Sequence, residues 1–134
     1  MNIFIIHGPN LNLLGLWSSK NNSSRLTLDK VNQKIRKYIR GKNISIKILQ
    51  SNSEEKIVSH IQKNRKKIDS IIITPGPLQN SGYVLSELLE LLEIPFVTVS
   101  YNKTDKVNLL NGIKNFNDKD ILSSYFKAID ELVK

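Results

Sequence analysis

The stretch that decides the fold is IIHGPNLNLLG, residues 5–15. It continues an apolar run that begins at Ile3, and four successive bulky apolar residues are typical of a strand covered on both faces of a sheet. Gly8 permits backbone torsions that other residues resist, and Pro9 restricts the turn that follows. Asn10 would then present an amide, both donor and acceptor, at the carboxyl end of the strand. The stretch therefore predicts a strand that opens onto a site.

Outward from this stretch, strand-like and helix-like runs alternate along the chain. Apolar runs and alternating patterns predict strands at 2–6, 44–49, 70–73 and 95–99, with a weak fifth strand at 113–116. Apolar residues at helical spacing predict a helix from an N-cap at Thr27 to about Gly41, one after Ser51 or Ser53, one at 81–92 and a last one at 121–133. In the third helix, Val84, Leu85, Leu88, Leu89 and Leu92 are expected to point inward. The polar stretches 17–25 and 100–112 are predicted to be loops.

This order of elements favours an α/β fold with a parallel sheet of four or five strands and helices on both faces. The chain of 134 residues is expected to form a single domain over 1–134. On such sheets, ligands bind beyond the carboxyl ends of the strands, where the strand order reverses. The loops expected at that end are 7–26, 50–53, 74–82 and 100–112.

Composition excludes several classes of site. The chain has no cysteine, so disulfides, thiolate metal sites and thiol nucleophiles are excluded. We expect no metal and no cofactor, because no ligand cluster or nucleotide-binding glycine motif is present. No apolar run is long enough for a membrane span, and the residues after Met1 resemble no signal peptide, so we expect a cytoplasmic protein. The net charge of +8 favours anionic partners, but solvated surface lysines are the preferred explanation, so the charge alone says little about partners.

Three segments resemble the type II 3-dehydroquinate dehydratases. They are GPNLNLLG at 8–15, QSNSE at 50–54 and IIITPG at 71–76. The resemblance covers residues 1–100 and the final helix. It implies a flavodoxin-like three-layer sandwich and a homo-oligomer, either a trimer or a dodecamer of trimers. In this family a tyrosinate beside an arginine takes a proton next to a ketone, a water held by the first motif's asparagine stabilises the enolate, and a histidine protonates the departing hydroxyl.

The sequence departs from the family at most of the positions that would carry this chemistry. Trp17 occupies the arginine place, and Asn22 or Ser23 the tyrosine place. Asn80 stands where the histidine belongs, and Thr74 replaces an asparagine. A Glu-Val-His pattern becomes residues 98–100, Thr-Val-Ser, and the arginine-bearing segment after it is shortened. An amide is neither an acid nor a base near neutral pH, so the sequence predicts loss of the dehydratase reaction.

The remaining polar residues at the predicted strand ends have alternative interpretations. Ligand contacts are predicted from a set that the loops would bring together: His7, Asn10, Asn12, Thr74, Asn80, Ser81, Ser100, Tyr101 and Asn102. Trp17 either stacks on a ligand or partner or packs against its own domain. Lys20 and Arg25 either bind an anion or are solvated. The asparagines can equally satisfy local turns, and His7 can be a hydrogen-bonded residue of a polar corner.

The sequence therefore predicts an inactive family member, a pseudoenzyme that serves as a binding, regulatory or assembly protein for a small anion or a protein partner. Nucleic acid is not expected, because the basic run 63–67 lacks interleaved aromatic residues. One alternative is an active dehydratase whose catalytic groups have moved, for instance to His7 and Tyr101. Another is a different small-molecule enzyme that uses the same pocket.

Overall fold

A computed structural model of the chain describes residues 1–21, 25–101 and 106–134. Five strands and seven helices follow one another in these residues: β1 (Asn2–His7), η1 (Leu11–Leu13), α1 (Leu14–Asn21), α2 (Leu28–Tyr38), β2 (Ser45–Gln50), α3 (Glu54–Asn64), β3 (Ser70–Thr74), α4 (Leu78–Ser81), α5 (Tyr83–Leu92), β4 (Phe96–Val99), β5 (Asn115–Phe116) and α6 (Ile121–Leu132). Each predicted strand exists, with bounds shifted by one or two residues.

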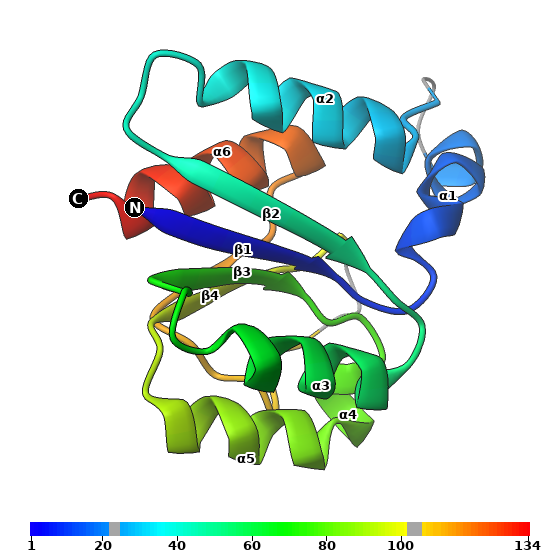
Figure 1. Ribbon diagram of the computed structural model, residues 1–134. Coiled ribbons are helices and arrows are strands. Elements are labelled where there is room, and N and C mark those ends of the chain that lie inside the picture. Colours follow the sequence, from blue (N-terminus) through cyan, green and yellow to red (C-terminus); the bar gives the residue numbers. More distant parts are fainter. Residues whose placement is uncertain (22–24, 102–105) are drawn as a thin grey trace.

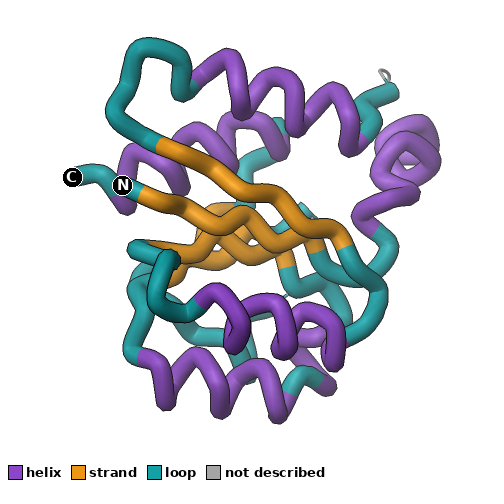
Figure 2. The backbone as a smooth tube through the Cα atoms, viewed as in Figure 1, coloured by secondary structure: helices purple, strands orange, loops and turns teal. Residues whose placement is uncertain are grey.

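The strands form one parallel sheet in the order β2-β1-β3-β4-β5. Helices α2 and α6 cover one face, and α3, α4 and α5 cover the other (Figures 1 and 2). The predicted α/β three-layer sandwich is therefore confirmed. Strand β2 lies on one side of β1, and β3 lies on the other side of β1. The reversal of strand order therefore falls between β1 and β3.

Alternate residues of β1 belong to two separate hydrophobic cores. Ile3 and Ile5 pack with α2 and α6, while Phe4 and Ile6 pack with α3 and α5. All four are buried, as expected for a central strand of a parallel sheet. Burial of each such side chain contributes roughly 1.5–3 kcal/mol to the free energy of unfolding, so the apolar run near the start of the sequence stabilises both cores.

Helix caps confirm two of the predicted starts. The Thr27 hydroxyl accepts a hydrogen bond from the Lys30 N–H at the start of α2, and Ser53 does the same for Lys56 at the start of α3. Helix α2 ends at Tyr38 rather than near Gly41, which lies in the following turn with a left-handed φ of 75°. Each cap satisfies one of the N–H groups that a helix leaves unpaired.

The predicted loop at 17–25 is wrong for its first half, because α1 extends to Asn21. Its start is anchored by Leu14, which is buried in the core. The buried Ser18 hydroxyl donates to the carbonyls of Gly15 and Leu26 and accepts from the Leu26 N–H. Tertiary contacts thus stabilise a helix whose sequence has little apolar periodicity.

The predicted helix at 81–92 is also corrected. Gly82 separates α4 from α5, and a Cβ there would lie 2.7 Å from the Leu78 carbonyl oxygen. Helix α5 therefore begins at Tyr83, and Val84, predicted to point inward, is 60% exposed. Within the described ranges, no helix has the length and apolar character needed to cross a membrane.

The cap of α2 offers a direct test. Thr27→Ala removes the hydroxyl that accepts from Lys30 and should lower the free energy of unfolding by about 1 kcal/mol. Thr27→Ser, which keeps the hydroxyl, should retain most of the stability. Urea unfolding followed by circular dichroism measures both variants, and equal losses would show that the hydroxyl contributes nothing.

Candidate functional site

The loops after β1 and β3 meet beyond the carboxyl ends of these strands. The Gly8 N–H donates to the Thr74 carbonyl over 2.9 Å, and a Cβ at Gly8 would lie 2.6 Å from that oxygen and 2.9 Å from the Pro75 oxygen. No side chain fits in such a space, so the position requires glycine. This close approach brings the first motif against residues 74–76.

The loop after β2 joins the same end of the sheet. Asn10 adopts a left-handed φ of 71°, and its backbone N–H donates to Asn52 Oδ1 over 3.0 Å. Gln50 Nε2 donates to the Gly8 carbonyl and to the same Asn52 oxygen, each over 3.2 Å. The residues of the first two motifs therefore hold one another in place, and they leave Asn10 exposed at the end of the sheet.

A chain of hydrogen bonds runs through the core below these loops. His7 Nε2 lies 2.9 Å from Asn32 Oδ1 on α2, and His7 Nδ1 lies 3.0 Å from the Tyr125 hydroxyl on α6. The Tyr125 hydroxyl is 2.5 Å from the Thr74 hydroxyl at the end of β3. Because an amide oxygen only accepts, Nε2 carries the imidazole proton and Nδ1 accepts from Tyr125.

Burial keeps both titratable members of this chain neutral. Desolvation lowers the pKa of His7 to about 4, although the hydrogen bond with Asn32 acts in the opposite direction. Desolvation also raises the pKa of the Tyr125 phenol well above its ordinary value, against the effect of the bond to Thr74. His7, Thr74 and Tyr125 are all fully buried, so they form a polar corner of the core rather than a reactive surface.

Aromatic side chains pack beside the carboxyl end. Trp17 of α1 is half-buried and meets Tyr101 edge-on, with ring centroids 5.2 Å apart. The Tyr101 hydroxyl reaches toward the β3 loop, where it would be 3.9 Å from a Cβ on Gly76. Trp17 thus packs against its own domain, one of the two roles predicted for it, and Tyr101 lies near both Trp17 and Gly76.

Several of the other predicted residues make hydrogen bonds outside this group of loops or are exposed. Ser100 is buried and donates to Asn115 Oδ1 over 3.2 Å, toward β5. Asn80 is exposed on α4, and its Oδ1 accepts from Asn108 over 3.4 Å. Ser81 donates to the Pro77 carbonyl and Asn12 is exposed. Asn102, Asn22 and Ser23 lie outside the described residues.

The two loop cations are exposed. Lys20 lies in the last turn of α1, and the Arg25 guanidinium crosses the start of that helix, with Nε 3.1 Å from the Cβ position of Gly15. Within the described ranges, no group of three or more His, Asp and Glu residues is arranged to hold a metal ion.

Sequence reasoning missed three residues that organise the site. Asn32 and Tyr125 complete the buried chain, and Gln79 clamps the chain at 108–110. The Gln79 side chain donates to the Leu110 carbonyl and accepts from the N–H groups of Asn108 and Leu110. The sequence did contain a signal for Tyr125, which lies on the apolar face of an amphipathic helix. A phenol buried there normally has a hydrogen-bond partner.

The fold and the site together define a class: a parallel α/β protein whose polar loops gather at the reversal of strand order. A model of the family described as dehydroquinase class II matches residues 1–118. The chain is 35% identical to the 3-dehydroquinate dehydratase of Clostridium botulinum strain 657 over 98 residues, which are 73% of this chain and 66% of that protein. It is 31% identical to the same enzyme of Haemophilus influenzae strain PittGG over 104 residues, 78% of this chain and 69% of that protein.

Solved structures agree. The type II dehydroquinase of Butyrivibrio crossotus superimposes with a TM-score of 0.85 at 27% identity, over 100% of this chain and 98% of that one. A 3-dehydroquinate dehydratase-like protein of Bifidobacterium longum shares the fold at 12% identity, with a TM-score of 0.73 over 98% and 94% of the two chains. The chain belongs to the type II dehydroquinase family, as its motifs predicted.

The buried imidazole predicts a pH dependence of stability. The pKa of His7 is about 4 in the folded chain and 6.5 for an ordinary histidine, so between these values the unfolded state binds more protons. The stability contribution is complete above pH 6.5 and falls as the pH drops toward 4, by roughly 2 kcal/mol at pH 5.

Urea unfolding at pH 7 and pH 5 measures this loss. Carboxylates also titrate in this range, so the contribution of His7 is the difference between the wild-type chain and His7→Gln, which should lose less stability on acidification. His60→Gln is the comparison: partial burial and the charges of Lys47 and Lys63 also lower the pKa of His60, so this change should reduce the pH dependence too, but by less than His7→Gln because His60 is only partly buried. An identical pH dependence in all three proteins would contradict the role given to His7.

Proposed function

We propose that this chain is a dehydroquinase-family protein without dehydratase activity, which uses the carboxyl end of its sheet to bind a small anion or a protein partner. The observation that carries the proposal is the state of the two histidines. His7 is enclosed and neutral, and His60 lies on α3, away from the strand ends. Neither supplies a proton to a ligand over Asn10.

The position at which the family resemblance implies the acid supports the same conclusion. Asn80 is an exposed amide on the short helix α4, hydrogen-bonded to Asn108. It can orient a ligand but cannot protonate a leaving hydroxyl. Loss of a general acid and of the tyrosinate base each removes about 10²–10⁴ in rate, which together abolishes useful turnover.

Binding is supported by what the chain retains. Asn10 keeps its place on a loop whose backbone is fixed by Gly8 and Asn52, so its side chain leaves the end of the sheet from a defined position. Lys20 and Arg25 are exposed beside α1 and supply positive charge for an anionic ligand. We further propose a cytoplasmic protein that forms a homo-oligomer, with the trimer or dodecamer that the family resemblance implies. The exposed Tyr83, Val84 and Leu91 of α5 supply apolar surface for association.

The alternative is an active dehydratase with relocated groups. It requires Tyr101 to act as the base and a second group to act as the acid, because both His7 ring nitrogens are occupied by Asn32 and Tyr125. A different enzyme on the same pocket would bind an anion without converting 3-dehydroquinate.

Mixing the purified protein with 3-dehydroquinate separates these functions. We expect no growth of the absorbance of the conjugated enone product, while the C. botulinum enzyme run in parallel should produce it. A thermal-shift measurement on the same sample reports whether the compound binds. Turnover by the wild-type chain would overturn the proposal.

Asn80→His sharpens the test. The single change should leave the protein inactive, because no tyrosine occurs between residues 1 and 37 to supply the base. Asn108→His places the same group on the neighbouring segment and serves as the control. Substantial dehydration by Asn80→His alone would show that the remaining machinery is intact.

A further inference from the structure

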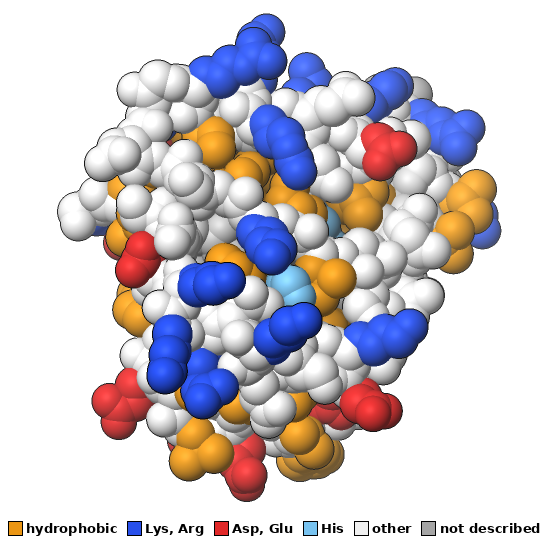
Figure 3. Space-filling model, in the orientation of Figure 1, with side chains coloured by type: hydrophobic (Ala, Val, Ile, Leu, Met, Phe, Trp, Pro, Cys, Tyr) orange, Lys and Arg blue, Asp and Glu red, His pale blue; other side chains and the backbone are white. Residues whose placement is uncertain are grey.

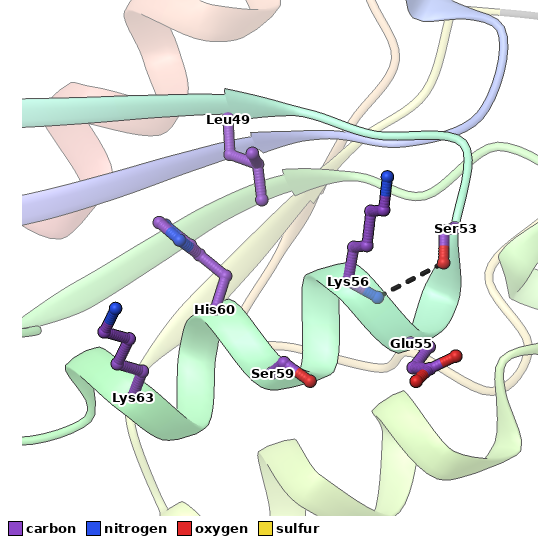
Figure 4. Close-up of a pocket in the computed structure, with 7 residues that line it drawn as sticks. All are labelled: Leu49, Ser53, Glu55, Lys56, Ser59, His60 and Lys63. Atoms are coloured by element: carbon purple, nitrogen blue, oxygen red, sulfur yellow. Dashed lines mark hydrogen bonds between the residues drawn. The ribbon is translucent and has the colours of Figure 1, made fainter.

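A basic groove lies on a different part of the molecule, between the edge strand β2 and helix α3. It has a volume of about 390 Å³ and is lined by Leu49 of β2 and by Ser53, Lys56, Ser59, His60 and Lys63 around α3. Figure 4 shows the side chains of Lys56, His60 and Lys63 directed from α3 toward β2. Glu55, the acidic residue of the lining, points away from β2 in that view.

The groove is open on the side of β2, which is the last strand of the sheet. The N–H groups of Ser45 and Ser51 donate to β1, at the carbonyls of Met1 and His7. In a parallel ladder every second residue directs its backbone toward the same neighbour. The N–H and C=O groups of Ile46, Ile48 and Gln50 therefore face outward, and within the described ranges β2 pairs only with β1.

Positive charge surrounds this free backbone. Lys47, in the middle of β2, extends over the face of the sheet that α3 covers, with Nζ 5.9 Å from the centre of the Phe4 ring, and His60 packs against the same ring at 5.6 Å. Burial lowers the pKa of His60, and the charges of Lys47 and Lys63 lower it further, in agreement with the position of both lysines beside this side chain. Figure 3 shows Lys and Arg side chains gathered over β2 and α3 on this face.

We propose that the β2–α3 groove binds an acidic peptide segment, which adds to the outer side of β2 as a sixth strand and directs its carboxylates toward Lys47, Lys56 and Lys63. Strand addition of this kind combines backbone hydrogen bonds for affinity with side-chain contacts for specificity. Alternate residues of an added strand point to the same face, so acidic residues at every second position would all meet α3.

The same lysines argue against a second copy of the chain as the occupant. Exposed lysines on edge strands prevent pairing between identical molecules, and a chain with a net charge of +8 repels itself here. The positive charge that repels a basic strand attracts an acidic one, so the charge of the groove selects between partners. Among its lining residues the groove shares only Ser53 with the loops at the carboxyl end, and the inference does not depend on the function proposed for them.

A labelled peptide of about seven residues with glutamate and valine in alternation tests the proposal by fluorescence polarisation. We expect saturable binding by the wild-type chain and a loss of about fivefold or more in affinity for Lys47→Glu, since an exposed ion pair becomes a repulsion. Lys119→Glu is the matched control: it makes the same charge change beyond β5, at the opposite edge of the sheet, and should bind like the wild type.

Two further measurements separate strand addition from attraction between charges. The same peptide with N-methyl groups on the amides that would face β2 should bind much more weakly, although its charge is unchanged. Hydrogen exchange should slow at the amides of Ile46, Ile48 and Gln50 when the unmodified peptide is present. Equal binding of the methylated peptide, equal losses for Lys47→Glu and Lys119→Glu, or no protection of β2 would each overturn the proposal.

Discussion

The buried chain of hydrogen bonds from Thr74 through Tyr125 and His7 to Asn32 is the constraint on which the rest of the structure depends. It joins β3, α6, β1 and α2 at one corner of the core. A buried polar group without a partner costs about 1–3 kcal/mol, so α2 and α6 cannot slide over the sheet without leaving several groups unpaired. Apolar packing holds the layers together, and these hydrogen bonds determine how α2 and α6 are positioned along the sheet.

The same constraint decides the chemistry available at the carboxyl end. His7 follows the strand that opens onto the site, yet its imidazole turns inward and both nitrogens are used. Gly8, the next residue, approaches Thr74 closely, and the hydrogen bond of the Asn10 N–H to Asn52 holds the loop with Asn10 at the surface. The site thus presents amides, hydroxyls and aromatic rings on a rigid frame, which suits recognition better than proton transfer.

The two surfaces considered for binding differ in physical character. At the carboxyl end, loops from β1, β2 and β3 are tied to one another, and selectivity would come from a few oriented amides. At the β2 edge, a free backbone is flanked by lysines, and selectivity would come from charge. Both proposals involve anionic partners, in agreement with the charge of the whole chain: a small anion or a protein partner at the first surface and an extended acidic segment at the second.

Much of the fold could be predicted from the sequence alone. The run Ile3 to Ile6 determined a central strand covered on both faces, because four adjacent apolar side chains must be buried on opposite sides of a sheet. The caps at Thr27 and Ser53 could also be predicted, because each hydroxyl binds a helix N–H only three residues further along the chain. The family followed from the first motif, whose glycine is required by a contact that the sequence does not show.

Only the tertiary structure decided the rest. Helix α1 depends on Ser18 bonding to Leu26 and on Leu14 entering the core, so no local pattern revealed it. Val84 is exposed, although its spacing from Leu88 predicted an inward position. His7 could have been a surface acid or a core residue, and the choice came from Asn32 and Tyr125, which are far away along the chain. Local chemistry determines a strand or a cap, whereas the state of a buried side chain depends on partners that only folding brings to it.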